Sequence, residues 1–166
     1  MADWAFLDLL PPAATSILLY FESVGPPAIV TAWFGKDVPV VEESADTLPD
    51  DRLANYSVQG KTVGADPWPT DRTSKALIAR LRTLTQTSCA APLTWITSST
   101  LCTKLIGYLD QAEANRAAGK STQAKSSMNS YISSLSGKTA GTFASGVTNP
   151  AYWLLKPNAD IVIRVL

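Results

Sequence analysis

Histidine is absent from this 166-residue chain, and its absence excludes several common catalytic and metal-binding sites. Serine or cysteine nucleophiles that depend on an imidazole base cannot be built, nor can histidine-ligated metal centres. Two cysteines are too few for a four-thiolate zinc site. The glycine spacings of phosphate-binding and dinucleotide-binding loops are also missing. We therefore predict a protein that is not an enzyme and that needs no cofactor or metal.

The two cysteines, Cys89 and Cys102, lie close together in the sequence. An even number with none left over is typical of a disulfide in an oxidising compartment. The alternative is a pair of reduced, buried thiols in a cytosolic protein. We expect an extracellular or cell-surface protein whose signal peptide is absent from this chain, because the N-terminal residues have no basic side chain and Pro11-Pro12 interrupts their apolar stretch.

Charge is balanced over the chain but divided between its halves. Residues 1–72 carry 11 acidic and 4 basic side chains, a net charge of −7, whereas residues 73–166 carry 3 acidic and 10 basic ones, a net charge of +7. Opposite charges can hold the halves together or drive head-to-tail contact between copies. Alternatively, each half simply carries the charge of its own ancestor, and the asymmetry drives no contact. The basic residues form no run of neighbours, so we do not expect nucleic acid as a partner.

The first 72 residues have the pattern of short strands and loops. Apolar, β-branched runs at 15–22, 28–34 and 38–41 lie between glycine and proline residues, which predicts strands. Residues 42–72 are rich in acidic residues, proline and threonine. There we predict a long loop that contains one small hairpin within residues 56–63.

From residue 73 onward, apolar residues recur at helical spacing. We predict helices that start near Thr73 or Ser74, at Ser98, at Ser121 and at Asn149-Pro150. Pro157 is expected to kink or divide the last helix, and residues 161–163 could form a strand instead. No apolar run reaches the length of a transmembrane helix. The predicted fold is α+β, with a β-rich acidic region at 1–72 and a basic bundle of three to four helices at 73–166.

A motif begins at Leu101-Cys102-Thr103-Lys104-Leu105 and continues through alanines at 112–118, Gly119, Gly137-Lys138 and an apolar segment at 151–161. This stretch of about 65 residues resembles the FIMAH domain, a bacterial module found near the C-termini of larger secreted or surface proteins. The chain departs from the family pattern in its loop at 139–149 and at Pro157. The resemblance implies a helper module and no catalytic residues.

Tryptophan is frequent, and its five side chains are candidates for a core or for a contact surface. Trp33 and Trp153 lie within apolar runs, so we expect them in cores. Trp68, between two prolines, and Trp95, beside the cysteine loop, are expected to be exposed. Exposed tryptophans can stack on sugar rings or anchor an interface.

Carboxylates are the remaining candidates for catalysis, since paired acids can hydrolyse glycosides. Glu22, Glu42 or Glu43 could serve such an enzyme, but we favour a solvated acidic loop as the explanation of the acids from Glu42 to Asp51, with loose divalent-cation binding as a further alternative. The acids between 42 and 51 lack the spacing of a calcium loop.

We predict a non-enzymatic structural or adhesive module of a secreted or surface bacterial protein. The alternatives are a self-assembling subunit of a filament, shell or virion, and a small carbohydrate-acting enzyme. The expected partners are other protein chains, including copies of this chain that meet through the acidic and basic halves, and a glycan is a further candidate.

Overall fold

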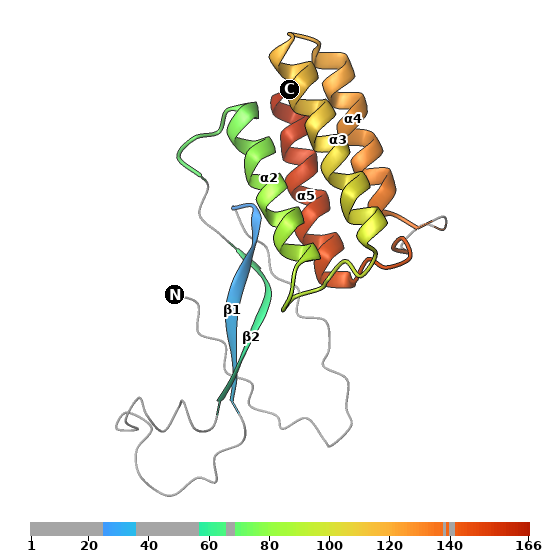
Figure 1. Ribbon diagram of the computed structural model, residues 1–166. Coiled ribbons are helices and arrows are strands. Elements are labelled where there is room, and N and C mark those ends of the chain that lie inside the picture. The colour runs from blue at the N-terminus through green and yellow to red at the C-terminus, as the bar shows by residue number, and fades with distance from the viewer. Residues whose placement is uncertain (1–24, 36–56, 66–68, 138, 140–141) are drawn as a thin grey trace, which may run out of the picture.

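The computed structural model describes residues 25–35, 57–65, 69–137, 139 and 142–166. Within these residues an antiparallel two-stranded sheet is followed by four helices, which confirms the predicted α+β class. Figure 1 shows the helices side by side in a bundle and the strands as a ribbon that extends from one end of it. The elements are β1 (Pro27–Gly35), β2 (Ser57–Ala65), α2 (Ser74–Cys89), α3 (Ser99–Ala117), α4 (Ser121–Leu135) and α5 (Asn149–Val165).

The core of the bundle is built from one apolar stripe on each of these helices. In α3, for example, Leu105, Leu109 and Ala112 recur at helical spacing and are fully buried. Burying one leucine side chain stabilises the fold by roughly 1.5–3 kcal/mol. The core therefore supplies the main driving force for folding. It comprises Leu77, Ile78, Leu81, Ile96, Leu105, Leu109, Ala112, Met128, Tyr131, Leu135, Val147, Ala151, Leu154, Leu155, Ala159 and Val162.

The helix starts agree with the sequence pattern to within one residue. Thr73 Oγ1 accepts a hydrogen bond from the Ala76 amide at 3.3 Å. Ser98 caps α3 in the same way, through the Leu101 amide at 3.2 Å. Ser121, predicted as a cap, is instead the first residue of α4, and its hydroxyl bonds the Leu166 carbonyl. Likewise, Asn149 is the first residue of α5, and the cap position belongs to Thr148.

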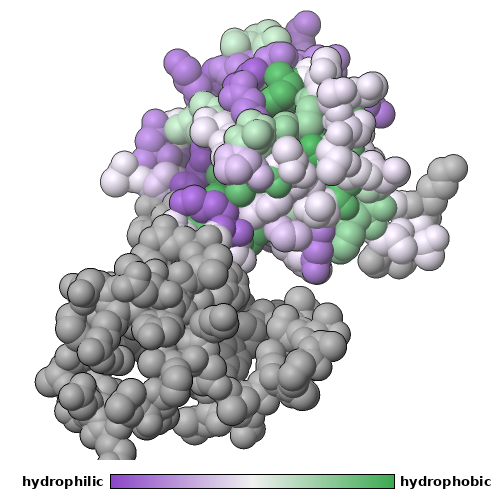
Figure 2. Space-filling view, turned by 60° about the horizontal axis from the view of Figure 1, so that its bottom comes forward, coloured by the Kyte–Doolittle hydropathy of each residue, from purple (hydrophilic) through white to green (hydrophobic). Residues whose placement is uncertain are grey.

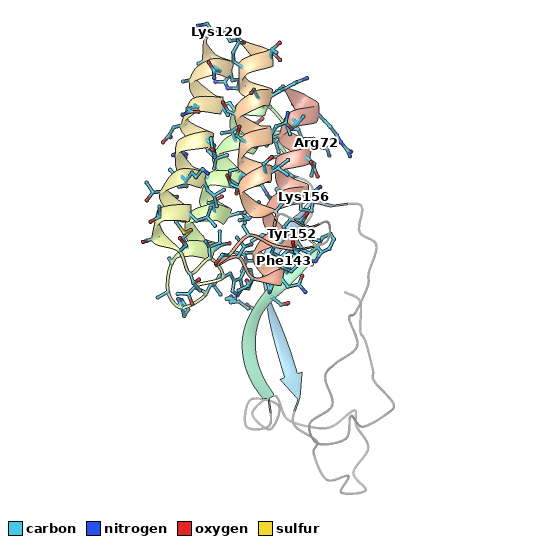
Figure 3. The ribbon with its side chains drawn as sticks, turned by 90° about the vertical axis from the view of Figure 1, so that its right-hand side faces the viewer. Arg72, Lys120, Phe143, Tyr152 and Lys156 are labelled. Atoms are coloured by element: carbon cyan, nitrogen blue, oxygen red, sulfur yellow. A yellow bond between two sulfur atoms is a disulfide. The ribbon has the colours of Figure 1, made fainter. Side chains whose placement is uncertain are left out.

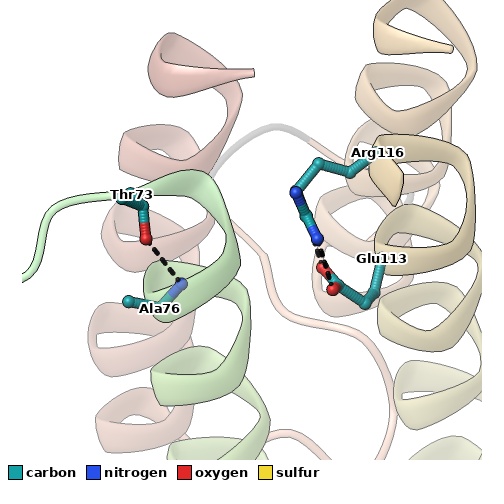
Figure 4. A network of polar contacts seen from close by, with 4 residues as sticks. All are labelled: Thr73, Ala76, Glu113 and Arg116. Atoms are coloured by element: carbon teal, nitrogen blue, oxygen red, sulfur yellow. Dashed lines mark hydrogen bonds and ion pairs between the residues drawn. The ribbon is translucent and has the colours of Figure 1, made fainter. Parts of the chain in front are cut away.

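Charged side chains link the neighbouring helices α2 and α3. Arg82 on α2 forms an ion pair with Asp110 on α3. One turn further along α3, Arg116 binds Glu113 with two bonds of 2.7 Å, close to the start of α2 in Figure 4. The Arg116 hydrogen bonds lower the pKa of Glu113, and Lys75 and Arg82 contribute to the same shift. The acids of α3 are therefore neutralised within the bundle.

The ribbon is attached to α5 by a buried amide. Asn158, only 6% exposed, donates from Nδ2 to the Pro27 carbonyl at 2.9 Å and to the Leu154 carbonyl at 2.8 Å. Ile29 and Val63, opposite each other in the ribbon, pack against the core. These contacts fix one end of the ribbon and leave the rest extending away from the bundle, as Figure 1 shows.

The predicted strand at 28–34 is confirmed as β1, but the hairpin predicted within 56–63 is wrong. Residues 57–65 form one strand, which pairs with β1 from Pro27↔Ala65 to Gly35↔Ser57. A Cβ at Gly64 would lie 2.5 Å from Val30 Cγ2, so this glycine is required by close packing rather than by a turn. The predicted strands at 15–22 and 38–41 lie outside the described residues, and the division at residue 72 stays a prediction.

Helix α5 passes through Pro157 without a break, so the predicted division of this helix is wrong. Residues 161–163 are helical rather than a strand. Because proline has no N–H, the Trp153 carbonyl one turn earlier lacks its helical donor. The tertiary contacts of α5 with α2, α4 and the ribbon compensate for this loss.

One polar pair lies inside the core. The Thr85 hydroxyl donates to the Leu81 carbonyl at 2.8 Å. The Tyr131 hydroxyl lies 2.7 Å from Thr85 Oγ1. Because the Thr85 proton is already used, Tyr131 donates to Thr85. Burial raises the pKa of Tyr131 well above its usual value, because the phenolate would lose its hydration.

We expect Tyr131 to make the fold sensitive to alkaline pH. An unfolded tyrosine ionises near pH 10, so the stabilisation from neutral Tyr131 is complete below that pH. It is then lost at about 1.4 kcal/mol per pH unit above it. Tyr131→Phe should cost about 1 kcal/mol at neutral pH. Denaturant unfolding should show that the difference in free energy of unfolding between the native protein and Tyr131→Phe disappears by about pH 11. A difference that stays constant with pH would contradict the burial of a neutral Tyr131.

Candidate functional site

The segment before α5 is fixed by hydrogen bonds to the end of α4 and to the loop between α2 and α3. The Ala144 amide bonds the Leu135 carbonyl at 3.0 Å at the end of α4. The Thr148 amide bonds the Trp95 carbonyl at 3.0 Å in the loop between α2 and α3. These bonds hold the first turns of α5, and the loop beside them, in a defined position.

An aromatic cluster lies at this position, formed by Phe143, Tyr152 and Trp153. The rings of Phe143 and Tyr152 are 4.8 Å apart, and those of Tyr152 and Trp153 meet edge to face at 5.4 Å. Phe143 and Tyr152 are half-buried, whereas Trp153 is 54% exposed. Figure 3 shows Phe143 and Tyr152 close together near the end of the bundle from which the strands extend.

Polar groups adjoin this aromatic cluster on the next turn of α5. The Lys156 amine donates to Asp160 at 2.8 Å, and both side chains are partly exposed. The hydrogen bond to Asp160 raises the pKa of Lys156 above its usual value, so the lysine stays charged. At spacings of three and four residues, Trp153, Lys156 and Asp160 share one side of the helix. The site therefore combines an exposed apolar ring with donors and acceptors.

Trp153 corrects a prediction, since the sequence placed it in a core. The run Tyr152-Trp153-Leu154-Leu155 is apolar throughout, but the helix buries only Leu154 and Leu155. No periodicity within four consecutive apolar residues distinguishes the buried side from the exposed one. The signal that was missed lies in the longer repeat, in which position 153 falls opposite the buried stripe.

The other tryptophan predictions have mixed outcomes. Trp95 is half-buried and packs against the core, and its role as a contact residue stays a prediction. Trp68 lies outside the described residues, and of Trp33 only the backbone is described. Of the two predicted contact tryptophans, the structure describes Trp95, which is not one of the rings of the aromatic cluster.

A disulfide joins Cys89 to Cys102, as predicted from the sequence. It connects the last residue of α2 to the first turn of α3, with a Cα–Cα distance of 6.2 Å. A shallow depression of about 530 Å³ lies beside it, lined by Gln86, Ile106, Gly107 and Asp110 among others. It contains one carboxylate, which is paired with Arg82.

The described carboxylates do not form a catalytic pair. A glycosidase acid needs a raised pKa, but hydrogen bonds lower the pKa of Glu113 and of Asp71. In the described part of the chain no group of three or more Cys, Asp or Glu residues could hold a metal ion. Glu22, Glu42 and Glu43 lie outside that part. The described carboxylates bond as follows: Asp71 with Thr73, Asp110 with Arg82, Glu113 with Arg116 and Asp160 with Lys156.

Large apolar patches are not visible on the end of the bundle seen in Figure 2. Apolar residues there lie in small areas between hydrophilic ones. None of the described helices is long and apolar enough to cross a bilayer.

Comparison with known proteins gives no relative: no family model, curated protein or solved structure matches this chain. The resemblance to the FIMAH domain therefore rests on the motif in the sequence and stays a prediction.

We expect the disulfide to stabilise the bundle by about 3 kcal/mol, because it closes a short loop in the unfolded chain. Reduction, or the double substitution Cys89→Ser and Cys102→Ser, should lower the free energy of unfolding by that amount in urea titrations. Reductant should leave the unfolding midpoint of the double variant unchanged, which serves as the control. Equal midpoints for the oxidised and reduced native protein would contradict this expectation.

Proposed function

We propose that the chain is a non-enzymatic adhesive module of a secreted or surface bacterial protein. The observation that carries the proposal is the aromatic cluster, in which a mostly exposed tryptophan is supported by two further rings. An indole ring offers a flat apolar surface, and the C–H face of a sugar ring stacks on such a surface. Lys156 and Asp160 provide hydrogen-bonding groups for the hydroxyls beside it.

The disulfide supports the extracellular part of the proposal. Disulfides persist in oxidising compartments and are rare in reducing ones. Cys89 and Cys102 also tie together the two helices that carry the bundle's opposing charges, Arg82 and Asp110. A bundle held in this way suits a module that must remain folded outside the cell, which is also what the FIMAH resemblance implies.

The test is binding to polysaccharides. We expect the full chain to bind on a glycan array or to co-sediment with insoluble cellulose, chitin or peptidoglycan. Trp153→Ala should weaken that binding by roughly thirtyfold, the effect of losing an anchor worth about 2 kcal/mol. The melting temperature should remain close to that of the native protein, because the side chain is largely exposed.

Val165→Ala is the matched control. Val165 is also exposed, at 46%, and lies at the far end of the same helix. This variant should bind as the native chain does. Absence of binding to every polysaccharide, or equal loss in both variants, would reject the adhesive function.

Self-assembly is a second candidate, and the distribution of ion pairs favours it. The three acids of residues 73–166 are all paired within the bundle. Lys104, Lys120 and Lys125 have no acidic partner among the described residues, so the bundle keeps an excess of positive charge. The acidic residues of 1–72 in another copy would complement that charge.

Assembly through opposite charges should weaken with salt. Light scattering of the full chain should show higher-order particles at low ionic strength that dissociate as added salt screens exposed charges. Lys120→Glu and Lys125→Glu together should lower the mass at low salt. A particle mass that does not depend on salt would exclude contact of this kind.

A further inference from the structure

We propose that the outer edge of β1 pairs with β1 of a second copy, so that two ribbons form one four-stranded antiparallel sheet. This interface goes beyond the adhesive function and uses different residues. It is carried by the backbone of the ribbon rather than by charged side chains.

The backbone groups on the free edge of β1 follow from the register. Proline has no N–H, so Pro27↔Ala65 is a non-hydrogen-bonded pair. Asn158 bonds the Pro27 carbonyl, which agrees with that carbonyl pointing away from β2. Because such pairs alternate along the ladder, the N–H and C=O groups of Ile29, Thr31 and Trp33 also point away from β2.

Within the described part of the chain, this edge has none of the protection that edge strands usually carry. Monomeric proteins guard their edges with charged residues, internal prolines or a covering element. From Ala28 to Gly35 the strand contains neither a charge nor a proline. Among the residues that the structure describes, no further strand lies along it. The outward N–H and C=O groups on alternate residues of this uncharged strand form a template for another strand.

The ribbon also needs additional support. An isolated pair of strands is marginally stable in water. Among the described side chains of the ribbon, Ile29 and Val63 are the ones that pack against the core. Toward Gly35 the strands extend beyond the bundle in Figure 1. Further strands would supply hydrogen bonds and packing where the bundle does not reach.

A second copy fits the edge because the edge is self-complementary. When two β1 strands run antiparallel about a twofold axis at Trp33, Thr31 of one copy lies opposite Gly35 of the other. All of these positions have outward-facing groups, so each opposing pair exchanges two N–H···O bonds. A twofold contact of this kind closes on itself and gives a dimer rather than a filament. Centring it on the outer half of β1 keeps it clear of α5, which holds Pro27.

Thr31→Pro tests the interface, because it removes an outward N–H that β2 does not use. Lys61→Pro is the matched control. Lys61 is opposite Thr31, its Nζ donates to Thr31 Oγ1 at 2.6 Å, and its own N–H faces the outer edge of β2. Both variants lose this side-chain bond and both place proline at a non-hydrogen-bonded position. Only Thr31→Pro blocks the edge of β1.

We expect the native full chain and Lys61→Pro to sediment as dimers, at twice the mass of one chain. Thr31→Pro should sediment as a monomer, at 17.7 kDa. The measurement is made at high salt, where contacts between charged halves are screened. At high salt a dimer cannot be attributed to contact between charged halves, and its mass does not depend on glycan binding. Failure of the β1 dimer is therefore distinguishable from failure of the adhesive function or of the charge-driven assembly.

Hydrogen exchange gives a second readout that needs no variant. The amides of Thr31, Trp33 and Gly35 should become more protected as protein concentration rises, whereas the amide of Lys61 should not. A native chain that remains monomeric would overturn the proposal, including the case in which residues 15–22 of the same chain cover the edge. A dimer that Thr31→Pro leaves intact, or that both proline variants dissociate equally, would also overturn it.

Discussion

Burial of the apolar side of α5 is the interaction on which the rest of the structure depends. This helix contacts α2, α4 and both strands, so it joins the bundle to the ribbon. Its buried stripe includes Leu154, Leu155 and Val162, while Asn158 within that stripe provides the amide that holds Pro27. The same helix carries Tyr152 and Trp153 on its remaining surface. The core, the attachment of the ribbon and the candidate binding site therefore all depend on α5. Burial of one side of this helix fixes the positions of Asn158, Tyr152 and Trp153.

The helices could be predicted from sequence because their signals are local. Capping residues such as Thr73 and Ser98 precede apolar residues at helical spacing, and both kinds of signal act within a few residues. The disulfide was likewise predictable, because Cys89 and Cys102 have no other cysteine to pair with. Strand β2 was not, because Gly60 and Gly64 resemble turn residues. In the fold Gly64 is instead required by Val30 on the neighbouring strand, a contact between residues far apart in the sequence.

The candidate site was only partly predictable for a related reason. The sequence predicts exposed tryptophan as the binding group, but it also predicts that Trp153 lies in a core. The error arose because Trp153 lies in a continuous apolar run, in which neighbouring residues do not show which side of the helix is buried. The structure keeps the helix intact, because the buried contacts around Leu155 and Ala159 outweigh one lost backbone hydrogen bond. Tertiary packing thus determines which side of α5 faces the solvent.

The two proposals have a joint consequence for binding. A single tryptophan stacked on a sugar ring holds a ligand weakly, since an aromatic contact contributes on the order of 1 kcal/mol beyond the area it buries. Two chains joined through β1 would present two copies of Trp153 on one particle, each fixed relative to its own ribbon by Asn158. A polysaccharide repeats its sugar units, so both clusters can engage one polymer. Linked sites of this kind can exceed the affinity of either site by about 10²–10⁴-fold without any new contact. Dimerisation would therefore turn a weak aromatic site into an effective adhesive one, provided that the spacing of the two clusters matches the polymer.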